Sequence, residues 1–160
     1  PVATLESILD AAVEFIAPLS GGEMLDLIGE VMALAVETGN YEAFRQVIYA
    51  QEERFFRRIA CDSRETIPIT LALFRLADGD VEKVVTYGAN FGRDADTIAT
   101  MGGAMAGAYR GVNGIRADWV EKAQQVTAVD QENLAERLIR TARVKFDTQE
   151  VARQEFVAMQ

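Results

Sequence analysis

Apolar residues recur along this chain at the three- and four-residue spacing of an α-helix, and this pattern restricts the fold more than any other feature. Such spacing places the apolar side chains on one helix face, which must pack against another element. The clearest stripes are Leu5, Ile8, Leu9, Ala12, Val13 and Ile16, then Leu27, Ile28, Val31, Leu34 and Ala35, then Phe44, Val47, Ile48 and Phe55. No run alternates apolar and polar residues over the length of a strand. We therefore predict an all-α fold in one compact unit.

Prolines, glycines and capping residues set the expected helix ends. Pro18 and the Ser-Gly-Gly run at 20–22 are expected to end the first helix, and Pro68 is expected in the first turn of a later one. The predicted helices cover about 5–16, 23–37, 41–59, 68–76, 81–89, 97–109, 119–126 and 131–141. The tail after Phe146 is expected either to dock as a helix or to fray.

Composition excludes several classes of function. Sixteen Lys and Arg against 25 Asp and Glu give a net charge of −9, which disfavours nucleic-acid and anionic-membrane partners because like charges repel. The chain has no histidine, so it cannot by itself form a Ser-His-Asp triad, a zinc finger or an imidazole base. Its single cysteine, Cys61, cannot form an internal disulfide, which predicts a cytoplasmic protein with Cys61 as a small packing residue.

Candidate chemistry concentrates in residues 90–111. Asp94 and Asp96, followed by Thr97, come after a segment with no helical period. In a loop or an irregular helix start, two carboxylates and a hydroxyl form a hard-oxygen site suited to Mg²⁺, Mn²⁺ or Ca²⁺. The alternative is that these three residues cap the next helix and complement its dipole. In the metal-binding interpretation, Gly92 lets the backbone approach a ligand, and Asn90 and Arg93 contact it.

The helix that follows carries a row of small residues. Gly103, Gly107 and Gly111 are four apart. Each helix-interior glycine costs about 1 kcal/mol relative to alanine, so close packing against another helix is expected to offset the cost. We predict a buried central helix with the two carboxylates at its N-terminus.

These residues carry a resemblance to a known family. The segment Gly92-Arg-Asp-Ala-Asp-Thr97, the Gly/Ala-rich helix after it, and Ile115 and Trp119 resemble the C-terminal signature of ADP-ribosylglycohydrolases. Glu65-Thr-Ile-Pro-Ile-Thr-Leu-Ala72 resembles the segment that precedes this signature in the family, where a proline starts a helix. The resemblance covers residues 63–120 well, although an arginine at position 116 replaces the usual proline.

The resemblance implies a compact orthogonal multi-helix bundle that binds two divalent cations, usually Mg²⁺ with Mn²⁺ as a second candidate. It implies hydrolysis of a glycosidic bond to ADP-ribose, with Asp94, Asp96 and Thr97 as metal ligands. Asn90, Gly92 and Arg93 are then expected near the ADP-ribosyl or related nucleotide substrate. In that role the cations hold the ribose hydroxyls and orient or activate water.

Two departures from the family pattern limit what this chain is expected to do alone. Family members carry a second metal motif with adjacent aspartates, whereas no Asp-Asp pair occurs here, and the chain has about half the usual family length. We therefore expect residues 1–160 to form the C-terminal half of a single all-α domain. The N-terminal half, on the same protein or on a complementary chain, is expected to supply the catalytic residues.

Two other functions remain open from the sequence. One is a non-catalytic family member, crystallin-like or binding ADP-ribose without turnover. The other is a glycosidase that acts on a related nucleoside or nucleotide. Among neighbouring residues, Arg64 and Glu65 are candidates to line the pocket, while Tyr87 and Phe91 are expected to pack in the core rather than stack on a base.

Overall fold

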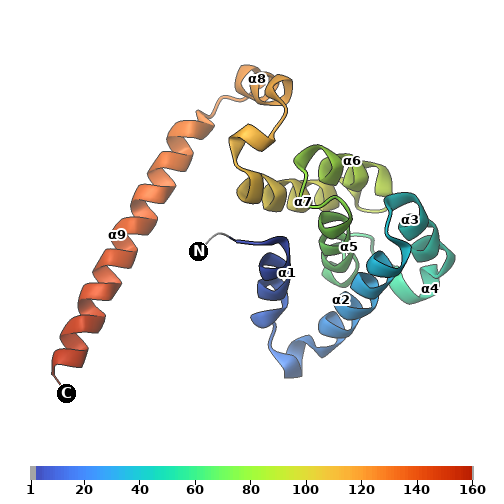
Figure 1. Ribbon diagram of the computed structural model, residues 1–160, viewed down its shortest axis with the longest axis horizontal. Coiled ribbons are helices and arrows are strands. Elements are labelled where there is room, and N and C mark those ends of the chain that lie inside the picture. The colour runs from blue at the N-terminus through green and yellow to red at the C-terminus, as the bar shows by residue number, and fades with distance from the viewer. Residues whose placement is uncertain (1–2, 160) are drawn as a thin grey trace. The chain divides into compact units, whose positions relative to one another are not determined.

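The computed structural model describes residues 3–159, and every regular element in that range is a helix, which confirms the all-α prediction (Figure 1). The chain divides into two compact units, unit 1 up to Arg116 and unit 2 from Ala117. Unit 1 contains α1 (Leu5–Glu14), α2 (Pro18–Thr38), α3 (Tyr41–Ala50), α4 (Glu52–Phe55), α5 (Ser63–Leu76), α6 (Val81–Phe91), α7 (Ala95–Arg110) and the short 3₁₀ helix η1 (Val112–Gly114). Unit 2 contains α8 (Ala117–Val126) and α9 (Gln131–Ala158).

Helix α5 lies at the centre of unit 1, and most of its residues from Glu65 to Phe74 are buried. It contributes to both apolar clusters of the unit. One cluster joins α5 to α2 and α3 and takes in Phe44, Phe91 and Ile98. The other joins α5 to α1, α2, α6 and α7 around Phe74. Burying a side chain as large as that of Phe74 stabilises the fold by about 1.5–3 kcal/mol. The buried side chains of α5 therefore form the centre of the core.

Several predicted helix ends were wrong. Pro18 begins α2 instead of ending a helix, and the Ser-Gly-Gly run lies inside α2. Proline fits a first helical position because an N–H group there would have no intrahelical acceptor, so nothing is lost by its absence. Pro68 lies inside α5, since the helix already begins at Ser63 after the cap provided by Asp62. The predicted helix over 41–59 is divided at Gln51 into α3 and α4.

The loop between α4 and α5 carries another correction. Cys61 is exposed there, so its prediction as a small packing residue was wrong. Sequence favoured burial because free cysteine behaves as a small hydrophobe, but residue 61 lies outside the helices that form the core.

Helices α6 and α7 approach each other closely. A Cβ on Gly88 of α6 would lie 2.7 Å from the Cα of Ala99 on α7. The buried residues of α7 are Ile98, Gly102 and Ala106. The prediction of close helix packing is confirmed, and Gly103 of the expected row takes part in it, because a Cβ there would lie 2.9 Å from Val85 Cγ2 on α6. A Cβ on Gly107 would meet only Ile115 Cδ1, at 4.0 Å, and Gly111 is the C-cap with φ +70°.

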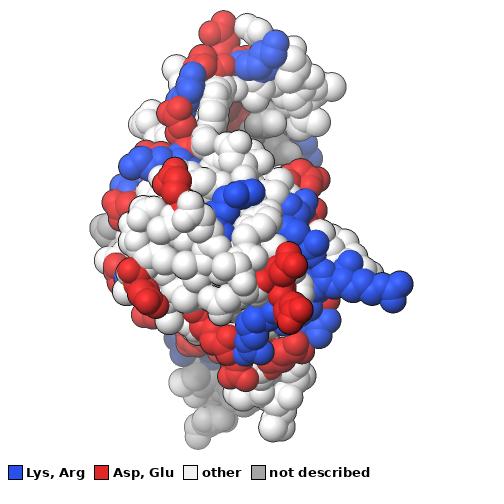
Figure 2. All heavy atoms as spheres, turned by 90° about the vertical axis from the view of Figure 1, so that its right-hand side faces the viewer, with Lys and Arg blue, Asp and Glu red and all other residues white. Residues whose placement is uncertain are grey.

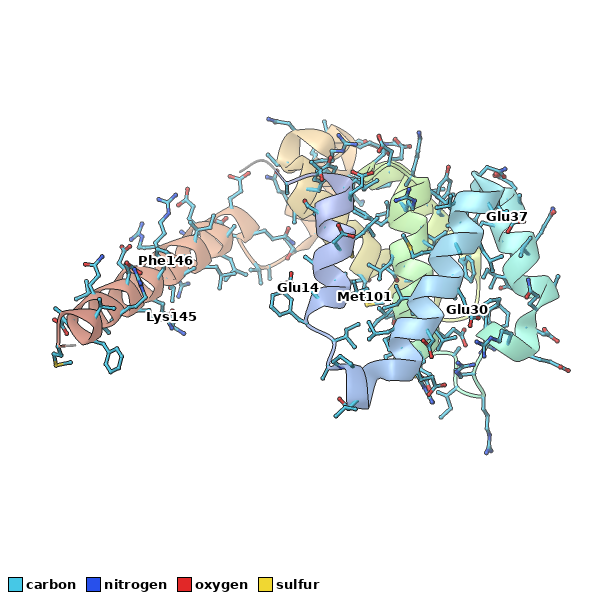
Figure 3. The ribbon with its side chains drawn as sticks, turned by 60° about the horizontal axis from the view of Figure 1, so that its bottom comes forward. Glu14, Glu30, Glu37, Met101, Lys145 and Phe146 are labelled. Atoms are coloured by element: carbon cyan, nitrogen blue, oxygen red, sulfur yellow. The ribbon has the colours of Figure 1, made fainter. Side chains whose placement is uncertain are left out.

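Unit 2 differs from unit 1 because none of its described residues is buried. Helix α9 extends past Phe146 to Ala158, so the tail is helical. In Figure 3 the side chains of α9 stand away from the helix on several sides, with Phe146 and Lys145 labelled. Phe146 is 68% exposed. Among residues 3–159, no helix is long and apolar enough to cross a membrane.

We predict that Gly88→Ala destabilises unit 1 by about 1–3 kcal/mol, because the added methyl group meets the backbone of α7. The midpoint of urea denaturation measures this. Gly29→Ala is the matched control: Gly29 is also inside a helix, but no atom lies within 4 Å of its added Cβ. The control is expected to gain up to about 1 kcal/mol. Equal midpoints for the two variants would contradict the close contact.

Candidate functional site

The turn between α6 and α7 has an unusual backbone. Gly92 has φ +94° and Arg93 has φ +60°, so two consecutive residues adopt positive φ. The turn is anchored at Phe91, a fully buried residue whose carbonyl accepts hydrogen bonds from the Tyr49 hydroxyl at 2.8 Å and from Arg45 Nε at 2.9 Å. A Cβ on Gly92 would collide with the Tyr49 hydroxyl. Position 92 therefore requires glycine for two reasons: its φ is positive, and there is no space for a Cβ beside the Tyr49 hydroxyl.

Asp94 lies directly before α7 at the N-cap position, yet its side chain accepts no hydrogen bond from the helix. Its Oδ2 atom is buried and has no hydrogen-bond partner. Leaving a buried polar atom unpaired costs about 1–3 kcal/mol, and more for a charged group. This argues against the capping alternative for Asp94. An unpaired carboxylate oxygen held in place is the kind of atom that a hard cation binds.

Other helices that begin after an aspartate show the contrast. Asp62 accepts from the amide of Arg64 at 2.9 Å, Asp80 from Lys83 at 2.9 Å, and Asp130 from Asn133 at 3.0 Å. Each of these carboxylates satisfies an N–H group that has no partner within its helix. Asp94 occupies the same position without performing that role.

Asp96 and Thr97 lie in the first turn of α7, where the helix dipole favours negative charge. Asp96 is exposed and Thr97 is partly buried. Asn90 is exposed near the end of α6 and donates from Nδ2 to the Thr86 carbonyl at 2.8 Å. Within residues 3–159, no group of three or more His, Cys, Asp or Glu side chains is arranged to hold a metal ion. The part of the chain that the structure describes thus contains no complete metal site.

Arg93, which directly precedes Asp94, is held by an ion pair that was not predicted from the sequence. Arg93 donates from Nε to Glu65 Oε1 at 2.7 Å and from Nη2 to Oε2 at 2.9 Å. The Glu65 side chain is fully buried. These hydrogen bonds raise the pKa of the Arg93 guanidinium above its ordinary value. The two residues are 28 positions apart, and no periodicity or motif links them in the sequence.

The neighbouring surface carries charges of both signs. In Figure 2, Lys and Arg side chains lie beside Asp and Glu on the face shown. The ion pairs of unit 1 include Arg54 with Glu30, and Arg64 with both Asp62 and Glu23. Most of these side chains are partly or largely exposed, which agrees with a solvated charged face rather than a binding patch.

The aromatic residues beside the motif pack as predicted. Phe91 is fully buried, and Tyr87 stacks on Tyr41 with ring centroids 4.4 Å apart. A surface pocket of about 380 Å³ lies elsewhere in unit 1, between α1 and α2, and none of its lining residues comes from the turn before α7.

The comparisons with known proteins identify the family of the chain. The sequence profile of the ADP-ribosylglycohydrolase family matches residues 2–148, so the chain belongs to that family. The chain is 40% identical over 60 residues to "ADP-ribosylhydrolase ARH3" of Danio rerio, covering 38% of this chain and 16% of that protein. It is 43% identical over 51 residues to "Uncharacterized protein YegU" of Escherichia coli (strain K12), covering 32% of this chain and 15% of that protein. No solved structure gives a significant match.

The matched segments thus span less than a fifth of either curated relative. The family and the all-α fold confirm the sequence prediction.

We predict an unusually acidic carboxyl group at Asp62, the cap of the helix that carries Glu65. Hydrogen bonds from the Arg64 side chain and then its amide lower the pKa of Asp62 from 3.8 to about 2. Because the folded pKa lies below the unfolded value, this group contributes stability above about pH 4, and the contribution is lost as the pH falls towards 2. Carboxyl-carbon NMR titration measures the pKa. Arg64→Gln should raise it, whereas Arg75→Gln, farther along α5, should not.

Proposed function

We propose that this chain contributes the Asp94 segment of a metal-dependent hydrolase that cleaves the glycosidic bond of ADP-ribosylated substrates. The observation that carries the proposal is the buried, unpaired Oδ2 of Asp94 at the start of α7. Membership of the ADP-ribosylglycohydrolase family supports the reaction class.

In this proposal Asp94, Asp96 and Thr97 hold Mg²⁺, with Mn²⁺ as a second candidate. Both carboxylates lie at the N-terminus of α7, where the helix dipole favours negative charge. When bound, the cation supplies Lewis-acid polarisation and a template for the ribose hydroxyls and water. Asn90, Gly92 and Arg93 belong to the same turn region, and the proposal places them beside the substrate.

The remaining ligands and the catalytic residues are proposed to come from an N-terminal half, on the same protein or on a complementary chain. Mg²⁺ prefers six oxygen ligands in near-octahedral geometry, and two carboxylates with one hydroxyl leave the shell incomplete. The proposed location is cytoplasmic.

Metal binding is tested first. Mg²⁺ or Mn²⁺ at 100 times Kd should stabilise the folded chain by about 2.7 kcal/mol, seen as a rise in Tm. Asp94→Asn should abolish that rise because it removes the charge of the proposed ligand. Asp80→Asn is the matched control, since Asp80 is also an N-cap but its carboxylate is occupied by the Lys83 amide. An unchanged metal-dependent rise in Asp94→Asn would refute the ligand assignment.

Activity is tested by adding the N-terminal half of a family member to this chain and measuring Mg²⁺-dependent release of ADP-ribose. We expect release with the wild-type chain and at least a 100-fold loss with Asp94→Asn, on the order reported for removal of a key electrostatic group. Metal binding and ADP-ribose binding without release would instead support a non-catalytic family member. Release of a sugar from a free nucleotide alone would support the related glycosidase.

A further inference from the structure

Glu65 is a fully buried carboxylate beside the proposed metal ligands, and both of its oxygens are occupied. Oε1 accepts from Arg93 Nε at 2.7 Å, while Oε2 accepts from Arg93 Nη2 at 2.9 Å and from the Arg57 amide at 2.7 Å. A buried charge is tolerated only when it is paired and hydrogen-bonded in this way. Both oxygens of Glu65 thus accept hydrogen bonds from the protein, whereas Asp94 has an oxygen with no hydrogen-bond partner.

Arg93 is held from several directions. Besides its two bonds to Glu65, its Nη2 donates to the Arg57 carbonyl, and its guanidinium lies over the Phe56 ring at 4.7 Å from the centroid. All these partners belong to the α4–α5 loop or to α5. The pair therefore fastens the turn before α7 to the beginning of the central helix.

The backbone conformation of Arg93 determines how the chain enters α7. Its φ of +60° is unfavourable for a residue with a Cβ, and such a conformation persists only where the surroundings fix it. Arg93 directly precedes Asp94, whose φ of −89° and ψ of 57° differ from the extended backbone of the capping residues Asp62 and Asp80. The strained residue thus sets how the chain enters α7.

We propose that Glu65 and Arg93 are positioning residues: their ion pair holds the turn at 92–94 in the conformation that keeps the Asp94 carboxylate off the helix N–H groups and free for a cation. This inference rests on the proposed metal-binding function of Asp94. It gives Arg93 a positioning role in the turn, in addition to its proposed place beside the substrate.

Glu65→Gln tests the pair because it keeps the shape of the side chain and removes its charge. Changes in groups that orient metal ligands typically weaken metal affinity 10- to 100-fold, and we expect a loss of that order for Mn²⁺, measured by calorimetric titration. Glu23→Gln is the matched control, since Glu23 is itself exposed and pairs with Arg57 and Arg64 rather than with Arg93. The control should bind Mn²⁺ as wild type does.

A second readout does not depend on metal. Amide hydrogen exchange at residues 92–98 should accelerate in Glu65→Gln, while the amides of α2 keep their protection. If Glu65→Gln fails to fold, Arg93→Lys replaces it, because lysine keeps the charge but cannot form the two-pronged contact. Arg93→Lys should show a smaller loss of Mn²⁺ affinity and the same local acceleration.

The outcomes separate this inference from the proposed function. Wild-type Mn²⁺ affinity and unchanged exchange at 92–98 in either folded variant would overturn the positioning role, even with Asp94 confirmed as a ligand. A lower Tm with unchanged Mn²⁺ affinity would also overturn it, because the pair would then be only structural. If wild type itself binds no Mn²⁺ but exchange accelerates locally, the pair does hold the turn and the proposed metal function fails.

Discussion

The buried carboxylate of Glu65 links the core of unit 1 to its candidate site. It extends from α5, the helix that contributes to both apolar clusters, and it binds Arg93 in the turn before α7. A charge without exposure to water requires full compensation, and the three donors around Glu65 supply it. The same contacts that make the burial tolerable also determine where the turn lies, so stability and site geometry depend on one interaction.

The close contact between α6 and α7 supports this arrangement from the other side. Gly88 allows α6 to lie against Ala99, which brings the end of one helix near the start of the next. Phe91 then anchors the turn in the core, and Tyr49 and Arg45 bind its carbonyl. With both ends of the turn held, the positive φ of Arg93 persists, and Asp94 is left without a hydrogen-bond partner for Oδ2.

The position of the candidate site was predictable from the sequence, whereas its support was not. The Asp94-Ala-Asp-Thr97 run at a helix start suggested a hard-oxygen site because local spacing determines which side chains share a helix terminus. The sequence left open whether Asp94 caps its helix, since capping depends on backbone angles at the turn. Glu65 and Arg93 were singled out separately, one as a pocket residue and one as a substrate contact. Their pairing depends on how α5 packs beside the turn, which no short-range pattern records.

The sequence by itself determined that the chain is helical, because apolar spacing and helix propensity act over a few residues. It also determined the family, through the motif at 92–97 and the small-residue helix after it. Tertiary structure decided which glycines form the helix contact, that Cys61 is exposed, that Pro18 begins a helix, and that Arg93 is bound to Glu65. These features depend on which helix faces pack together. Contacts between residues far apart in the chain form only once the helices have packed.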